Sequence, residues 1–150
     1  MWVIESRPTA RLAQTTEDVA QYLAEVQSHA QRGPVLTGVR DTVTGEMFFK
    51  QNVESLPSEI HPMLQCRLES YLADPELVLN PKWGVPGTHS DFLALNEALL
   101  RRQSLGLSIN DLSEFEMYNV SLWSNRVGTT VPRCGNCQVL TDGVTVLSGR

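Results

Sequence analysis

The sequence predicts an α/β fold, a class in which helices pack on a central β-sheet. Three observations support this prediction. Three segments carry apolar residues at helical spacing, a hairpin signature lies between the first two, and a β-rich run follows the third. The chain has 150 residues, of which 41% are hydrophobic, so we expect residues 1–150 to form one domain around one core.

The first helix is expected in the segment TTEDVAQYLAEVQSHAQRG, with Thr16 as its N-terminal cap and with Gly33 and Pro34 ending it. Four apolar residues should form its buried face: Val19, Tyr22, Leu23 and Val26. Two β-prone runs follow, at 35–40 and 46–50, around the turn residues DTVTGE. We therefore predict a β-hairpin after the first helix.

A second helix is predicted over residues 57–73. Four apolar residues there recur at helical spacing: Ile60, Leu64, Leu68 and Leu72. The next segment, DPELVLNPKWGVPGT, should form an irregular loop, because its prolines remove backbone donors and restrict their neighbours. The loop leads to a third helix that begins at Ser90 and ends at Gly106. The apolar stripe of this helix is wide enough to predict that it is largely buried.

The remaining elements carry the cysteine pair. The run EFEMYNVSLWS is rich in β-forming residues and predicts a central strand. A turn region, NRVGTTVPR, leads to a short cysteine-headed helix through Leu140, and the turn at Asp142 and Gly143 precedes a last strand, VTVL. The predicted order is therefore α, β-hairpin, α, α, β, α, β.

Composition narrows the classes of function. The net charge of −5 argues against a broad phosphate-binding surface, although it leaves room for a small basic groove. No apolar run is long enough to span a bilayer, and the start, MWVIESRPTARLAQ, lacks the basic and apolar regions of a signal peptide. The chain has three cysteines, an odd number that suits metal or redox chemistry in a reducing compartment better than a disulfide framework.

The cysteines Cys134 and Cys137 are separated by two residues at the start of the expected short helix. Amide groups and the helix dipole favour ionised sulfurs there, so both thiolates could bind one ion. Such a pair alone also occurs in redox sites and structural zinc knuckles. His89, at the start of the third helix, adds a nitrogen ligand. Two sulfurs and one nitrogen leave one position of a tetrahedral zinc open for water, which is the catalytic arrangement.

A histidine and an acid two positions later, in GTHSDFLALNEAL, precede VPRCGNCQVL in the sequence. This combination resembles the zinc-dependent cytidine deaminase superfamily. Within it, the two motifs look like the YwqJ-like branch of bacterial toxin deaminases, and most like its single-strand DNA cytidine deaminase toxins. The resemblance implies a three-layer sandwich, in which a central mixed sheet has helices on both faces. It also implies Zn²⁺ as cofactor and the conversion of cytosine to uracil.

The resemblance assigns roles to residues of this chain. His89, Cys134 and Cys137 take the three zinc-ligand positions, and Asp91 takes the position of the acid that carries protons between water and base. Two departures accompany this assignment. The family's acid is normally glutamate, so the shorter Asp91 is expected to weaken the activity. Arg133 is inserted between proline and the first cysteine, where it is well placed to meet a phosphate.

Substrate contacts are predicted at three positions. Trp83 and Trp123 flank the motifs and could stack on a single-stranded or flipped base, or could pack in the core; Arg133 is the third. Cys66, in the second helix, is predicted to be a small buried hydrophobic residue. If instead Cys66 is a fourth ligand, the domain is non-enzymatic and holds a structural Cys₃His zinc site.

The leading hypothesis is a deaminase of cytosine in single-stranded DNA, forming the C-terminal toxic domain of a secreted bacterial effector that acts in the cytoplasm of a target cell. RNA or free nucleosides are alternative substrates, because the motifs report the chemistry at the base and not what holds its backbone. The resemblance also implies a cognate immunity protein as partner, and no membrane segment is expected in the domain.

Overall fold

The computed structural model describes residues 8–123 and 125–149. Its helices are α1 (Pro8–Val26), α2 (Pro62–Ala73), α3 (Ser90–Ser104) and α4 (Gly135–Leu140), and its 3₁₀ helices are η1 (Pro81–Trp83) and η2 (Leu112–Glu114). Its strands are β1 (Val35–Asp41), β2 (Met47–Gln51), β3 (Phe115–Ser121) and β4 (Thr145–Val146). Residues 1–7, part of the segment searched for a signal peptide, lie outside the described residues. No helix within the described ranges is long and apolar enough to cross a bilayer.

The four strands form one sheet in the order β2-β1-β3-β4. The predicted hairpin pairs β1 with β2 antiparallel, and β3 pairs antiparallel with the other edge of β1. Helix α4 connects β3 to β4, and these two strands are parallel. The sheet is therefore mixed, β3 is a central strand, and the predicted α/β class is confirmed.

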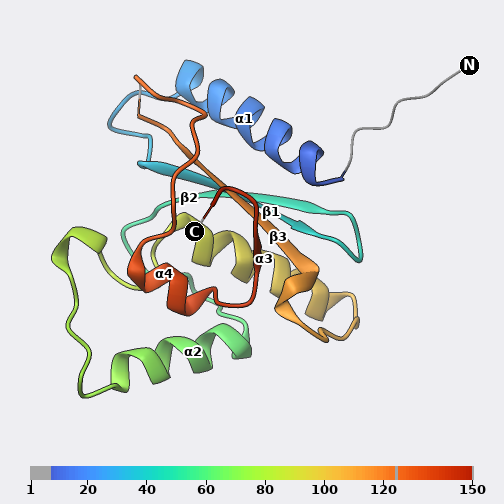
Figure 1. Cartoon of the computed structure of the whole chain (residues 1–150), viewed down its shortest axis with the longest axis vertical. Helices are drawn as coiled ribbons and strands as arrows, with labels where there is room; N and C mark the ends of the chain where they lie inside the picture. The colour runs from blue at the N-terminus through green and yellow to red at the C-terminus, as the bar shows by residue number, and fades with distance from the viewer. Residues whose placement is uncertain (1–7, 124, 150) are drawn as a thin grey trace, which may run out of the picture.

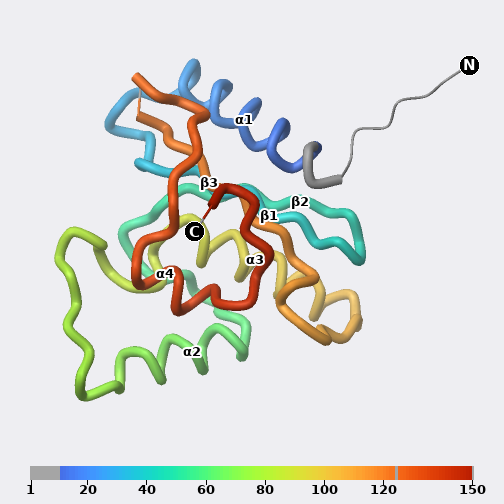
Figure 2. The backbone as a smooth tube through the Cα atoms, viewed as in Figure 1, coloured from blue at the N-terminus to red at the C-terminus, as the bar shows by residue number. Residues whose placement is uncertain are grey.

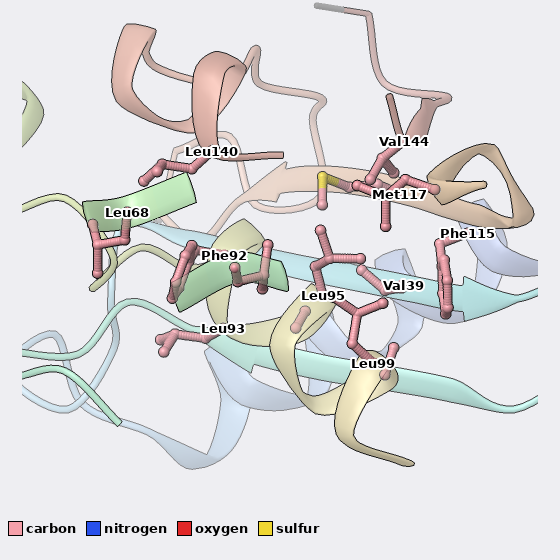
Figure 3. Close-up of a cluster of buried hydrophobic side chains, with 14 residues drawn as sticks. Val39, Leu68, Phe92, Leu93, Leu95, Leu99, Phe115, Met117, Leu140 and Val144 are labelled. Carbon is pink, nitrogen blue, oxygen red and sulfur yellow. The ribbon is translucent and has the colours of Figure 1, made fainter. Parts of the chain in front are cut away.

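Helices cover both faces of the sheet. Figure 1 shows α1 on one side, with α2, α3 and α4 on the other. The α1 face is closed by a cluster that includes Leu12, Leu36 and Val120. The opposite face holds the larger core, in which side chains of β1 and β3 meet the apolar stripe of α3 (Figure 3). This arrangement agrees with the expected three-layer sandwich, and the prediction of a largely buried third helix is confirmed.

The predicted start of the first helix is wrong, and its predicted buried face is confirmed only in part, because Val19 and Leu23 pack against the core cluster. The helix begins at Pro8, so Thr16 lies within it instead of capping it; its hydroxyl is buried and donates to the carbonyl of Leu12 at 2.7 Å. The exposed fraction of Tyr22 is 61% and that of Val26 is 55%, because the fully buried residues of the helix follow a different row. That row consists of Leu12, Thr16 and Ala20, which are four positions apart and lie on one face of the helix.

The second helix also differs from its prediction. It begins at Pro62 instead of residue 57, and the His61 ring accepts a hydrogen bond from the amide of Met63 at 3.1 Å. Only one narrow face of α2, with Leu64 and Leu68, is buried. Cys66 points away from that face and is exposed, so its prediction as a buried residue is wrong.

Candidate metal centre

The three predicted metal ligands come from the starts of two helices. His89 directly precedes α3, Cys134 directly precedes α4, and neither side chain caps its helix with a hydrogen bond. Cys137 lies in the first turn of α4. Figure 2 shows the segment that enters α4 descending beside the segment that enters α3. The fold thus brings His89 next to two cysteines that are 45 and 48 positions further along the chain.

The ligand atoms form an almost equilateral triangle. The Sγ atoms of Cys134 and Cys137 are 3.4 Å apart, and each lies 3.4 Å from Nδ1 of His89. A tetrahedral zinc with bonds of about 2.3 Å to sulfur and about 2.0 Å to nitrogen separates such atoms by roughly 3.5–3.8 Å. The triangle is only slightly tighter, so these residues could hold a metal ion and fit zinc with one position open. Cys66 does not belong to this group.

The two cysteines have pKa values that are shifted in opposite directions. A hydrogen bond from Cys137, supported by His89, lowers the pKa of Cys134 to about 4. The pKa of Cys137 is raised, first because its thiol donates to Cys134 and second because it is buried. One thiolate is therefore already favoured by the protein alone. A cation held by these residues would favour the second thiolate as well, because it would stabilise negative charge on both sulfurs.

The imidazole of His89 is oriented by backbone on its far side. Its Nδ1 faces the sulfurs, and a Cβ placed on Gly84 would lie 3.0 Å from its Nε2. The pKa of His89 is raised, chiefly by the hydrogen bond with Cys134 and also by a hydrogen bond to the backbone of Trp83. A carbonyl partner on one ring nitrogen leaves the other free to bind metal. Gly84 has a φ of 68°, so it supplies both the turn and the space.

Asp91 lies in the first turn of α3, close to the metal ligands. Its side chain is buried, and its Oδ1 accepts a hydrogen bond from the amide of Phe92 at 2.9 Å. Burial is the main cause that raises the pKa of Asp91, against the opposing effect of hydrogen bonds with Cys137 and Phe92. The carboxyl group therefore contacts the ligand set and favours its protonated form more than an exposed aspartate does.

A cleft of ≈ 270 Å³ opens beside the three ligands. Its lining includes His89, Asp91 and Cys134 together with the predicted substrate residues Trp83 and Arg133. This volume lies just below the about 300–1,000 Å³ of typical drug-sized pockets, so the cleft suits a small flat ring. A larger hollow of ≈ 430 Å³, between α3 and residues 53–59, contains none of the predicted site residues.

Trp83 forms part of one wall of this cleft. A Cβ on Gly135, the residue after Cys134, would lie 2.3 Å from Cη2 of the Trp83 indole. The ring thus packs directly on the backbone of the cysteine motif, and only glycine permits this contact. The exposed fraction of Trp83 is 36%, so the residue is not fully enclosed.

The other two predicted substrate residues are placed differently. Trp123 is 52% exposed and is not part of the cleft lining. Arg133 does line the cleft, but its Nη1 already donates to Thr141 at the end of α4, at 2.8 Å to Oγ1 and 3.3 Å to the carbonyl. The substrate roles of both residues stay predictions.

Sequence reasoning missed several polar residues around the centre. Oδ1 of Asn52 accepts from the amide of Ser90 at 2.8 Å, and the Tyr71 hydroxyl donates to Oδ1 of Asn136 at 2.6 Å. Asn119, on β3, lines the cleft. One signal could have found Asn119, because it is a polar residue at an inward position of the strand and the two preceding residues on that face, Phe115 and Met117, are apolar.

The fold and the centre define the chain as an α/β protein with a Cys₂His group that could hold a metal ion beside a cleft. Its sequence is 29% identical over 136 residues to a protein described as Toxin YwqJ, from Bacillus subtilis (strain 168). The match covers 87% of this chain and 22% of that protein, so the chain spans about a fifth of the length of this curated relative. No family model and no solved structure matches the chain.

Proposed function

We propose that this chain is a zinc-dependent deaminase that converts cytosine to uracil in single-stranded DNA, and that it is the C-terminal toxic domain of a secreted interbacterial effector. The observation that carries the proposal is the triangle of His89, Cys134 and Cys137, which borders a cleft with a buried carboxyl group at its side. The similarity to Toxin YwqJ supports the toxin part of the proposal.

The reaction exchanges an amine for an oxygen: water adds at C4 of cytosine, a C–O bond forms, the C4–N bond breaks and ammonia leaves. When bound, zinc lowers the pKa of a water molecule in its open position. Asp91 accepts a proton from water, transfers it to the ring nitrogen, and then protonates the departing amine. Trp83 lines the cleft and is the aromatic side chain there that could stack on the base.

Asp91 limits the rate in this proposal. Its carboxyl group is one methylene shorter than glutamate, and its Oδ1 is held back by the amide of Phe92. Misplacing a catalytic group by 1 Å costs about a hundredfold in rate. The expected activity of the chain is therefore low, and the longer glutamate should bring the carboxylate closer to both water and base.

The test compares zinc-loaded wild type with Asp91→Glu and Asp91→Ala. Each is incubated with a mixed pool of single-stranded DNA and RNA and with free cytidine, and conversion is read by sequencing and mass spectrometry. We expect uracil in the DNA, a rate increase of up to about a hundredfold for Asp91→Glu, and no product for Asp91→Ala. Product confined to RNA or to cytidine would show that this polymer or nucleoside, and not single-stranded DNA, is the substrate. Absence of product from Asp91→Glu on all three would refute the deaminase.

Two further parts of the proposal concern the cell. The toxin acts in the cytoplasm of the target cell, and a cognate immunity protein neutralises it. The net charge of −5 favours an immunity protein with a basic contact surface, since complementary charge speeds association. The check is co-expression of Asp91→Glu with neighbouring genes, with survival and the frequency of C-to-T mutations as readouts.

A further inference from the structure

In one buried side-chain amide beside the metal centre, the oxygen has a hydrogen-bond partner and the nitrogen has none. Asn119 has an exposed fraction of 2%, and it lines the same cleft as His89 and Asp91. Its Nδ2 has no hydrogen-bond partner in the described part of the chain. A buried amide group without a partner is unfavourable, and such groups in native proteins commonly mark a bound ligand or water.

The orientation of this amide is set by a chain of hydroxyl groups. Thr37 lies directly opposite Asn119 in the antiparallel pairing of β1 with β3, and its hydroxyl donates to Oδ1 of Asn119. Because that donation uses the only hydroxyl proton of Thr37, the hydroxyl of Ser90 must donate to Thr37 across their 2.8 Å contact. The oxygen of the Asn119 amide is therefore occupied, and its NH₂ group is the end left for a ligand.

The position of Ser90 connects this chain of hydroxyls to the metal centre. Ser90 stands between His89 and Asp91, and its amide is held by Oδ1 of Asn52 at 2.8 Å. Thr37, Ser90 and Asn119 are buried and Asn52 is half-buried, so the hydrogen bonds of the buried groups hold Asn119 in one orientation. Further along that sheet face, Val39 and Met117 are apolar and pack on α3, and buried Asp41 is paired with Arg102. Of the polar groups on this face, those of Asn119 and Ser90 are the ones that line the cleft.

We propose that the Nδ2 amide of Asn119 determines the specificity of the cleft by donating a hydrogen bond to the ring carbonyl oxygen of the base. In cytosine, this is the oxygen on C2. The inference rests on the proposed deaminase function and adds to it the group that selects the base. Asn119 is a substrate-binding residue in this account, and it takes no part in proton transfer.

A neutral carbonyl suits this donor better than an anion. The amide carries no charge. Lys82 and Arg133 also line the cleft, but Nη1 of Arg133 donates to Thr141, and an ionised Asp91 would repel a phosphate or carboxylate placed next to it. A flat ring that presents a carbonyl to Asn119 avoids this repulsion. It also satisfies the Nδ2 donor of Asn119, which is one of four buried side-chain nitrogens without a partner within the described residues; the others belong to Arg32, Arg133 and Asn136.

The first test uses the wild-type protein in its zinc form, labelled with ¹⁵N. The side-chain amide signals of Asn119, assigned by their loss in Asn119→Asp, are followed while cytidine is added. The same titration is repeated with the analogue in which hydrogen replaces the C2 oxygen. We expect the Asn119 signals to shift with cytidine and to stay unchanged with the analogue. Equal shifts with both ligands, or none with cytidine, would overturn the inference.

The second test measures selectivity in the Asp91→Glu background. The ratio of kcat/KM for cytosine to that for the analogue should be about a hundredfold or more with Asn119 present, and should fall to a few-fold in Asn119→Asp. The matched control is Asn96→Asp. Asn96 is also a buried amide, but it bonds His61 and Glu59 away from the cleft, so the ratio should not change. Deamination with an unchanged ratio in Asn119→Asp refutes only this inference, whereas no binding and no turnover of cytosine refute the proposed function as well.

Discussion

Polar side chains are buried at both ends of α3, but the two ends differ in how many hydrogen-bond partners these side chains have within the protein. At the C-terminal end, Arg102 has an exposed fraction of 1% and donates four hydrogen bonds, two of them to Asp41 and the others to Glu114 and Ser108. At the N-terminal end, the sulfurs of Cys134 and Cys137 lie 3.4 Å apart, and the Nδ2 of Asn119 lacks a partner within the described residues.

This difference indicates that the C-terminal end of α3 serves stability and that its N-terminal end serves function. The guanidinium of Arg102 lies between two carboxylates and above the ring of Phe115, with 4.9 Å from its Cζ to the ring centroid. Its partners all belong to the protein, and the group therefore stabilises the fold. The partners of the N-terminal groups are incomplete without a ligand, and the same burial there indicates a binding site.

The largest expected effect is the loss of metal. Cys134→Ser removes one of the three ligands, so the zinc content measured by mass spectrometry should fall from about one per chain to near zero. Circular dichroism should show the helices retained, because the core on α3 does not depend on this sulfur. The control is Cys66→Ser, at an exposed cysteine of α2, and it should keep its zinc. Zinc loss in this control would instead support a closed structural site with four ligands.

The next largest effect concerns the other end of α3. Arg102→Met leaves the carboxylates of Asp41 and Glu114 without their partner, so the free energy of unfolding should drop by about 3–5 kcal/mol. The control is Arg101→Met. Arg101 pairs with Glu46 at 3.3 Å in an exposed position, and its loss should change stability by no more than about 1 kcal/mol. Denaturant titration measures both, and similar losses would contradict the comparison.

A smaller effect is expected from a residue that supports the cysteine motif. Tyr71→Phe removes the hydrogen bond to Asn136, which lies between the two cysteines, and should weaken zinc affinity by about tenfold. The matched control is Tyr118→Phe, which removes a similar hydrogen bond to Glu17 on the α1 face and should leave zinc affinity unchanged. Competition with a chelator measures the affinities. Equal affinity of the two variants would show that Tyr71 does not support the centre.

The most gradual effect is the pH dependence of stability. Burial alone would raise the pKa of Asp41, but the hydrogen bonds from Arg102 and from the amide of Val43 outweigh it, so the pKa lies below its ordinary value of 3.8. Stability from this carboxylate is therefore complete above pH 3.8 and is lost as the pH falls through the lower folded-state value. The free energy of unfolding, measured from pH 5 downwards, should fall with pH in wild type and should fall less steeply in Arg102→Met. Parallel curves would exclude Asp41 as its source.

Much of the fold could be predicted because its signals are local. The limits of α3 and β3 agree with the predicted elements, since a wide apolar stripe and a β-rich run each define one element. The first two helices were predicted less well. The row that packs α1 on the sheet contains Thr16 and Ala20, which carry little hydrophobic signal, whereas the more apolar Tyr22 and Val26 remain exposed.

The sequence by itself determined the chemistry of the ligands. The histidine and the cysteine pair each stand at a helix start, and both their spacing and the signals that begin a helix are properties of a few consecutive residues. For this reason the two halves of the centre could be found without the structure, together with the short acid Asp91.

Only the tertiary structure decided how the surrounding side chains are used. Thr37 meets Ser90 and Asn119 across separations of 53 and 82 residues, and Arg102 meets Asp41 across 61. Trp83 lies on the cysteine motif, whereas Trp123 lies outside the cleft lining, although both flank the motifs in sequence. Whether a buried polar group finds all its partners depends on which strands and helices become neighbours, and this is set by the packing of the whole sheet.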